Sequence, residues 1–434
     1  MVFGSKQAIP DRSVSRSGRR SKRIYILPYI DPMTHKTITN PAPSEREDVV
    51  PLVSVAAMIA ALFAGSTALT PLYVIYREAF GFSQVTLTLV YAIYVIGNLV
   101  ALLLFGRVSD VIGRRPTVLA AVAVTVMSAV LFLLARNLAS LEIARVLSGL
   151  GIGVGVGSGT AWLSELIATE DKTFASMIAT GTNFVGLGIG ALIAGLLAEY
   201  APLPLRLTFI VYLAGLGVVA VMVWRTPETV RKPGHLADVS FRPRLGLPPE
   251  VRAHFVAPAV TGFGAMALVG FFAALAPGVL ARDLHIANHA AAGALFFELA
   301  LMAALTIALT GRLASRHAML AALALMPPAV ALVVAAQWFG SLSIMLIATA
   351  LCGIAAALGY RGSLQVVNQI APPARRAEIA SVYFICCFCG NALPVVGIGV
   401  ISTLVNATAA SLAFAGMIVV FALTALGFGM KYRR

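Results

Sequence analysis

The chain has 434 residues, of which 59% are hydrophobic and only 12% charged, and its formal net charge is +14. A soluble globular domain carries about 25% charged residues, so this composition excludes a soluble enzyme or a soluble binding module. The positive charge does not indicate nucleic-acid binding, because Lys and Arg stand between apolar runs and not in a cluster beside aromatic residues.

The first 50 residues are rich in Ser, Arg and Pro and contain a basic cluster around Arg20. No long apolar segment follows that cluster before Pro51, so a cleavable signal peptide is not indicated. We expect residues 1–50 to form a disordered basic tail in the cytoplasm. Met33 is an alternative start of the chain, since nothing before it is needed for the fold.

Apolar runs recur from Pro51 to Met430. A hydrocarbon core of about 30 Å needs about 20 apolar residues per helical crossing. Lipid offers no partners to backbone N–H and C=O groups, and alternating strands of a barrel are absent from the sequence, so each run is predicted to be a helix. The predicted helices cover residues 51–76, 84–106, 117–135, 140–166, 173–198, 205–224, 255–280, 289–311, 318–337, 341–370, 377–404 and 407–430.

A polar, proline-rich stretch from Arg225 to His254 separates the sixth helix from the seventh. The predicted fold is therefore all-α, a polytopic membrane protein whose 12 transmembrane helices form two pseudo-symmetric six-helix bundles. The predicted domains are a tail (1–50), an N-terminal bundle (51–224), a cytoplasmic linker (225–254), a C-terminal bundle (255–430) and a basic cytoplasmic C-terminus (431–434).

The basic residues outside the helices are distributed unequally between the two sides of the membrane. The tail, the linker and the C-terminus hold many of them, whereas the opposite side holds only Arg77, Arg136, Arg206 and Arg282. The positive-inside rule therefore places both termini in the cytoplasm. We expect a multi-pass protein of the bacterial inner (plasma) membrane.

The two halves of the sequence are related at an offset of about 205 residues. Segments aligned at this offset are Thr70-Pro71 with Ala276-Pro277, Gly106-Arg107-Val108 with Gly311-Arg312-Leu313, and Asn183 with Asn391. Such a duplication is typical of transporters, because a site between two rigid halves opens to either side when the halves rock.

After the second helix, residues 106–116 read Gly-Arg-Val-Ser-Asp-Val-Ile-Gly-Arg-Arg-Pro. This segment resembles the signature Gly-x-Leu-x-Asp-Arg-x-Gly-Arg-Arg of the major facilitator superfamily, with Val111 in place of the central Arg. The resemblance implies that Asp110 lies near the cytoplasmic N-terminus of the eleventh helix and holds the cytoplasmic side shut. The residues of this latch are Gly106, Arg107, Asp110, Gly113, Arg114 and Arg115; the alternative is a basic loop that only sets topology.

The fourth helix contains Arg145-Val-Leu-Ser-Gly149-Leu-Gly151, which resembles the Arg-x-x-x-Gly-x-Gly motif of the same superfamily. The resemblance implies proton coupling through Arg145. Arg145 lies about five residues, roughly 8 Å, from the predicted helix end, so it could instead reach the surface or pair with Glu142. From Gly149 to Gly159 every second residue is Gly, which predicts two small-residue ridges for close helix packing.

Three ionisable side chains are predicted at membrane depth, where a charge is costly: Arg145, Glu298 and Arg361. Glu298 and Arg361 lie roughly 20 Å and 15 Å from the cytoplasmic ends of their helices, which places both near the midplane. We expect Glu298 to bind and release the coupling proton with Arg361 as its partner; a fixed structural ion pair is the alternative. The coupling candidates are Glu142, Arg145, Glu298 and Arg361.

Polar residues continue along the tenth helix and along the matching part of the fourth. The resemblance implies that such residues line the transport cavity. The cavity candidates are Thr160, Trp162, Ser164, Glu165, Tyr360, Gln365, Asn368, Gln369, Asn183 and Asn391.

The sequence has no His-Glu-x-x-His motif, no intramembrane Asp pair and no P-loop, so neither an enzyme nor an ATP-driven pump is predicted. The four cysteines lie inside predicted helices, and we expect neither a disulfide framework nor a metal site, and no cofactor.

The prediction is a secondary active transporter that works by alternating access and exports small amphipathic organic compounds, as in the drug and sugar efflux branches. The first alternative is a proton-coupled uptake symporter for a small organic anion, which two buried arginines would suit; a non-transporting membrane sensor or enzyme is more remote. The expected partners are a small-molecule substrate, protons and the lipid bilayer, with no nucleic acid, and we expect a monomer.

Overall fold

The computed structural model describes residues 49–167, 172–231, 234–243 and 245–431. All regular elements within these ranges are helical, and twelve helices are long and apolar enough to cross a membrane. The predicted all-α fold with 12 spans is confirmed. The predicted tail as far as residue 48, and residues 432–434 of the C-terminus, lie outside the described residues.

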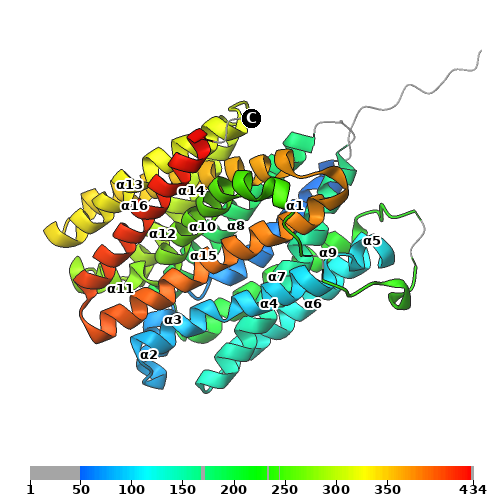
Figure 1. The fold of residues 1–434 in the computed structure, drawn as a ribbon. Coiled ribbons are helices and arrows are strands. Elements are labelled where there is room, and N and C mark those ends of the chain that lie inside the picture. Colours follow the sequence, from blue (N-terminus) through cyan, green and yellow to red (C-terminus); the bar gives the residue numbers. More distant parts are fainter. Residues whose placement is uncertain (1–48, 168–171, 232–233, 244, 432–434) are drawn as a thin grey trace, which may run out of the picture. The chain divides into compact units, whose positions relative to one another are not determined.

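The first six spans are α1 (Val49–Thr67), the segmented span α3 (Gln84–Ala92), α4 (Tyr94–Val100) and η1 (Ala101–Phe105), then α6 (Arg114–Leu133), α7 (Leu138–Leu166), α8 (Lys172–Tyr200) and α9 (Pro204–Arg225). The last six are α10 (Pro249–Ala274), α12 (His289–Leu309), α13 (Ser315–Phe339), α14 (Leu342–Ile370), α15 (Arg376–Leu404) and α16 (Ala407–Lys431). Short helices near the ends of spans are α2 (Tyr73–Phe80), α5 (Val108–Ile112), α11 (Ala276–Asp283) and η3 (Pro373–Arg375), and η2 (Leu236–Asp238) lies in the connection between α9 and α10 (Figure 1).

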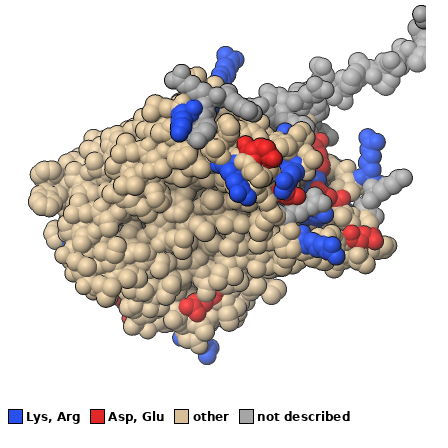
Figure 2. Space-filling model, viewed as in Figure 1, with Lys and Arg blue, Asp and Glu red and all other residues tan. Residues whose placement is uncertain are grey.

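Charged side chains gather toward the ends of the helices and leave a broad uncharged band between them (Figure 2). One end carries α5 and the connection between α9 and α10, and we call it the linker face; the other carries α2 and α11, and we call it the opposite face (Figure 1). An uncharged band of this kind is what a helical membrane protein presents to lipid.

Two of the predicted helices end early and resume as separate short helices. The helix predicted at 51–76 breaks after Thr67 and resumes as α2, and the helix predicted at 255–280 breaks after Ala274 and resumes as α11. The seventh span also begins earlier, at Pro249, because proline suits the first turn of a helix, where its missing N–H costs nothing. Apolarity alone predicts that a segment crosses the membrane but does not locate breaks within it.

The caps of the helices repeat from one half to the other. Ser83 and Asn288 accept backbone N–H groups at the starts of α3 and α12, and Asn137 and Ser341 do the same for α7 and α14. Each pair is about 205 residues apart, the offset that the sequence motifs predict. The duplication therefore extends to the local chemistry that starts the helices.

Five of the six alternating glycines of α7 pack closely against neighbouring helices, as predicted; the exception is Gly157, where a Cβ would meet nothing within 4 Å. A Cβ at Gly149 would collide with the backbone of Tyr94 in α4, and one at Gly151 would collide with Thr125 in α6. Gly159 lies equally close to Met58 in α1. Because glycine has no side chain, α7 approaches three helices at once.

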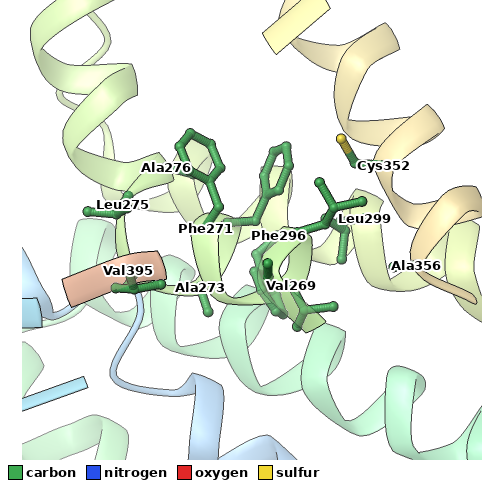
Figure 3. Close-up of a cluster of buried hydrophobic side chains, with 14 of the residues drawn as sticks. Val269, Phe271, Ala273, Leu275, Ala276, Phe296, Leu299, Cys352, Ala356 and Val395 are labelled. Carbon is green, nitrogen blue, oxygen red and sulfur yellow. The ribbon is translucent and has the colours of Figure 1, made fainter. Parts of the chain in front are cut away.

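The two halves meet along α8 and α12 and where α15 crosses α3 and α4. Gly195 of α8 lies against Gly293 of α12, so those two helices come into close contact. A large buried apolar cluster surrounds α10, and Figure 3 labels among its members Phe271 of α10, Phe296 and Leu299 of α12 and Cys352 of α14. This packing fixes the walls of the space between the halves.

Candidate functional site: a cavity between the halves

A cavity of about 400 Å³ lies between the two halves. Its walls come from α1, the α3–α4–η1 span, α7 and α8 of the first half and from α10, α12, α14 and α15 of the second. Aromatic side chains that line it include Phe63, Phe184, Phe296, Tyr360, Phe384 and Phe388. None of the described residues in its lining is charged.

A row of small polar side chains on α8 faces the cavity. Ser176, Thr180 and Asn183 follow one another at the spacing of successive helical turns, and all three line the wall. The amide Oδ1 of Asn183 is buried and has no hydrogen-bond partner among the described residues. The cavity therefore offers a buried acceptor to a polar group of a compound that enters it.

Toward the opposite face, hydrogen bonds between the halves close the cavity. The Tyr91 and Tyr94 hydroxyls both donate to Oδ1 of Asn391 on α15, at 2.6 and 2.7 Å, and Asn391 donates to the Met266 carbonyl at 3.3 Å. Farther along α15, a Cβ at Gly399 would lie against Thr88 of α3. The two helices are thus joined from the cavity to the opposite face.

Arg145 lies directly behind these tyrosines and is only 1% exposed. Its guanidinium donates to the Ser66 carbonyl at 3.0 Å and to the Tyr73 hydroxyl, and its central carbon lies 5.5–5.9 Å from the ring centroids of Tyr73, Tyr91 and Tyr94. Such contacts stabilise a buried cation. Arg145 therefore turns inward instead of reaching the surface, and it forms no ion pair with Glu142 among the described residues.

The structure separates Arg361 from Glu298, which corrects the expectation that they pair. Arg361 donates to the carbonyls of Gly311 and Leu313 and to the Thr310 hydroxyl, all at 2.9 Å, and also to the Thr310 carbonyl. It therefore lies at the linker-face end of α12 and not at the midplane. The reason is that α14, with 29 residues, extends beyond the end of α12.

Glu298 lies about 12 residues before Thr310 in α12, roughly 18 Å along the axis. It shares a helix face with Ala294, Leu301 and Leu305, which are exposed on the outside of the bundle. Glu298 is itself partly buried, and its Oε2 has no hydrogen-bond partner among the described residues. Glu298 is therefore not a lining residue of the cavity, and its carboxylate is partly covered by the bundle.

The motif at residues 106–116 forms a charged network at the linker face. Asp110 pairs with Arg114 at 2.6 Å, and Arg114 also pairs with Glu165 of α7 at 2.7 Å. The carboxylate of Glu228, which follows α9, accepts the backbone N–H groups of Arg114 and Arg115 at 2.9 Å each. The motif is thus tied to α7 and to the segment after α9.

Two glycines and a further arginine complete the motif. Gly113 has a φ of 118°, which side chains disfavour, and a Cβ there would press on the Glu228 carboxylate. Gly106 and Arg107 form the turn before α5.

In this structure α5 packs on α6 and η2, while α15 packs on α3 and α4 of the first half. Among the described ion pairs Asp110 binds Arg114, and its expected approach to the N-terminus of α15 stays a prediction.

Four of the predicted cavity candidates line the cavity: Thr160, Asn183, Tyr360 and Asn391. The others lie at the linker face, because α7 and α14 extend past the cavity. Trp162 donates to the Pro227 carbonyl, Glu165 pairs with Arg114, Gln365 and Gln369 bond to Ser315, and Ser164 and Asn368 are exposed.

Sequence reasoning missed the tyrosines. Tyr91 and Tyr94 are three residues apart and so share a helix face, a signal that the sequence does contain. What the sequence does not contain is the position of Arg145 behind them.

Residues 55–272 match the family model of the Major Facilitator Superfamily. The chain is 25% identical over 122 residues to the transporter paaT of Penicillium rubens, covering 28% of this chain and 22% of that protein. It is 24% identical over 188 residues to Citrate exporter 1 of Aspergillus niger, covering 43% of this chain and 35% of that protein. These matches span only about a fifth to a third of the curated relatives.

Two solved structures share the fold over nearly the whole chain. One is a bacterial homolog of the human lysosomal transporter Spinster in an inward-facing, unoccupied conformation, with a TM-score of 0.65, 18% identity, and coverage of 89% of this chain and 97% of that one. The other is the human organic anion transporter MFSD10 (TETRAN), with a TM-score of 0.64, 16% identity, and coverage of 88% and 99%.

Proposed function

This chain belongs to the Major Facilitator Superfamily and is a transporter, not an enzyme, and on that premise we propose that it exports small amphipathic organic compounds by alternating access. The observation that carries the proposal is the cavity of about 400 Å³, which is shared by both halves, rich in aromatic side chains and free of charged lining residues. Sites for organic molecules are mostly apolar with a few placed polar groups. A compound with an apolar body and one or two polar groups suits this lining.

The proposed route requires the closed end of the cavity to open. The bonds from Tyr91 and Tyr94 to Asn391 break, and α15 moves away from α3 and α4. In that opposite state we propose that Asp110 reaches the N-terminus of α15 and holds the linker face shut. The basic linker face would then be cytoplasmic, with both chain termini on that side of the plasma membrane, and the working unit would be a monomer.

A small organic anion is the second candidate for the cargo, in either direction of transport. Arg145 lies behind Tyr91 and Tyr94, so the end of the cavity that they form carries a positive potential. Two similar proteins are named for anionic compounds, a citrate exporter and an organic anion transporter, and an anion is what a positive potential attracts. A lipophilic cation is disfavoured by the same potential, so a neutral or acidic compound is the better match.

Proton coupling through Glu298 is a further part of the proposal. Glu298 is the tenth residue of a 21-residue span, so it lies near the middle of the membrane, where a charged carboxylate is costly. We propose that it binds a proton in one state and releases it in the other. With Arg361 committed to backbone carbonyls, the proton and not Arg361 would neutralise it.

The test of transport is a pair of glycine variants. Gly157 lines the cavity and a Cβ there meets nothing within 4 Å, so Gly157→Phe should plug the cavity without disturbing helix packing. Gly217 is equally open but lies exposed on α9, so Gly217→Phe is the matched control. Cells expressing the chain should accumulate less of a neutral amphipathic dye; Gly157→Phe should abolish this effect and Gly217→Phe should retain it.

Other outcomes of the same assay decide between the candidates. Increased accumulation of a carboxylate-bearing dye, lost in Gly157→Phe, would replace export by uptake of an organic anion. An unchanged effect in a correctly inserted Gly157→Phe variant would remove the cavity from the proposal.

The test of coupling is Glu298→Gln, which keeps the size of the side chain but cannot titrate. Transport driven by a proton gradient should be lost, while exchange of substrate without a gradient should persist. If gradient-driven transport survives, the role of Glu298 is rejected and Glu142, near Arg145, becomes the next residue to replace.

A further inference from the structure

A second cavity, of about 310 Å³, lies on the opposite face between the two halves. Its walls come from α2 and α3 of the first half and from α10, α11, α15 and α16 of the second. It shares no lining residue with the first cavity. Along α15, Ile398 in this cavity lies about seven residues, roughly 10 Å, beyond Asn391, so the contacts of Asn391 with Tyr91 and Tyr94 lie between the two cavities.

Two arginines line this second cavity, one from each half. Arg77 is in α2 and Arg282 is in α11, the short helices that follow the breaks after α1 and α10. They are about 205 residues apart, the offset that relates the halves. Few basic residues are predicted for this face, so the convergence of two of them on one cavity calls for an explanation.

Both guanidinium groups are held in place and still have N–H groups to donate. Arg77 donates one N–H to Oε1 of Gln84 at 2.9 Å, and Arg282 donates two to the carboxylate of Asp283 at 2.7 and 3.0 Å. A guanidinium has five N–H donors, so each retains several. The described ion pairs include no carboxylate partner for Arg77, and the adjacent Glu78 is exposed and outside the lining.

Two further groups of the lining are also donors. Ser402 contributes its hydroxyl, and Gln84, whose Oε1 is taken by Arg77, contributes its amide N–H groups, whereas the Ser411 hydroxyl already donates to Gln337. Asp283 offsets the charge of Arg282 from outside the lining, which leaves the positive charge of Arg77 in excess. A donor-rich, positively charged pocket of this size suits a small molecule with a carboxylate group.

We propose that this cavity binds a small, soluble organic carboxylate, held between Arg77 of the first half and Arg282 of the second. Because the two halves each supply one arginine, the site is complete only while they are closed against each other on this face. A ligand shifts an equilibrium toward the state that it binds better, so an anion in this site would hold the opposite face closed. The inference rests on the geometry of the pocket and not on the direction or cargo of transport.

The test measures protection of a cysteine placed in the pocket. Ser402→Cys in the full chain, purified in detergent, is labelled with a maleimide, and the extent at residue 402 is read by mass spectrometry of its peptide, so that the four native cysteines do not contribute. Citrate, at constant ionic strength, should slow labelling saturably. Adding Arg77→Gln or Arg282→Gln should weaken the apparent affinity at least about tenfold, the loss expected of one charge-assisted contact.

Arg206→Gln is the matched control, because Arg206 is exposed at the start of α9 and does not line the cavity. Protection should be unchanged in that variant. The proposal is overturned if citrate gives no protection, or if protection persists in both Arg77→Gln and Arg282→Gln.

The phosphate of an anionic lipid has chemistry close to that of a carboxylate, so a second arm adds phosphatidylglycerol to the micelles. Protection by this lipid but not by citrate would overturn the assignment to a soluble ligand. Since no step of the assay involves transport, its failure would leave the proposed function intact, and failure of transport would leave this site intact.

Discussion

The turn after the second span and the turn after the eighth occupy equivalent places in the two halves, but different chemistry holds each of them. In the first, Arg114 of the turn is bound by carboxylates from its surroundings, Asp110, Glu165 and, through its backbone N–H, Glu228. In the second, the turn supplies neutral carbonyls and a single guanidinium, that of Arg361, arrives from α14.

The difference shows that the duplicated topology requires the turn to be fastened to its bundle but does not fix the residues that do so. The first network includes partly exposed carboxylates, which can exchange partners when the halves move. The second is held by one buried guanidinium, which donates to several neutral carbonyls of the turn. We therefore expect the first turn to rearrange during transport and the second to remain a rigid part of its half.

The largest expected effect comes from removing the guanidinium of the second turn. Arg361→Met should lower the free energy of unfolding by about 3 kcal/mol, because several hydrogen bonds to one buried, charged donor are lost. Unfolding by sodium dodecyl sulfate in mixed micelles would measure it. Arg312→Met, an exposed arginine in the same turn, should change stability little; equal losses in the two variants would contradict the comparison.

A smaller effect is expected in the first turn. The side chain of Arg114 is 9% exposed, but those of its partners Asp110 and Glu165 are 57% and 35% exposed. When Arg114 is replaced, water therefore takes over much of the hydrogen bonding that these carboxylates lose. Arg114→Met should therefore lower the free energy of unfolding by about 2 kcal/mol, less than Arg361→Met. The same titration compares the two variants directly, and the reverse order would show that the charged network is the more rigid of the two.

Replacing Glu228 tests how much the contact between the first turn and the segment after α9 stabilises the protein. Its carboxylate accepts two N–H groups at the start of α6, as an N-cap does, and its charge lies near the positive end of that helix. Glu228→Gln should lower the free energy of unfolding by about 1 kcal/mol. Glu78→Gln, which is exposed on the opposite face, should have no measurable effect, and a comparable loss there would point to a general effect of charge.

The smallest effect separates the two turns by their response to salt. Raising the salt to about 1 M shortens the Debye length to about 3 Å and screens the exposed carboxylates of the first turn. The loss of unfolding free energy caused by Arg114→Met should shrink by about 0.5 kcal/mol. The loss caused by Arg361→Met should not change, because the carbonyls that Arg361 binds are neutral. Equal salt dependence of both penalties would remove the proposed distinction.

Much of the fold could be predicted because its signals are local. A run of about 20 apolar residues is sufficient to specify a span, so the predicted 84–106 and 140–166 agree with Gln84–Phe105 and Leu138–Leu166 to within a few residues. The alternating glycines of α7 predicted close packing for the same reason, since the absence of a side chain acts wherever a neighbouring helix passes.

The candidate site could be predicted only in part. Asn183 and Asn391 line the cavity, as expected from polar residues inside apolar helices, because such groups are costly against lipid. Trp162 and Gln365 have the same polar character but lie at the linker face. Their sequence pattern cannot distinguish these places, since it gives the face of a helix and not the height of one helix relative to another.

By itself the sequence determined the twelve spans, the family motif and the duplication, all of which depend on short segments or on repeats within the chain. The tertiary structure alone decided that Arg361 binds carbonyls at the end of α12, that Glu298 lies outside the cavity lining and that three tyrosines surround Arg145. The physical reason is that a buried charge takes the partners that packing brings within a few ångströms, and those partners come from helices that are distant in the sequence.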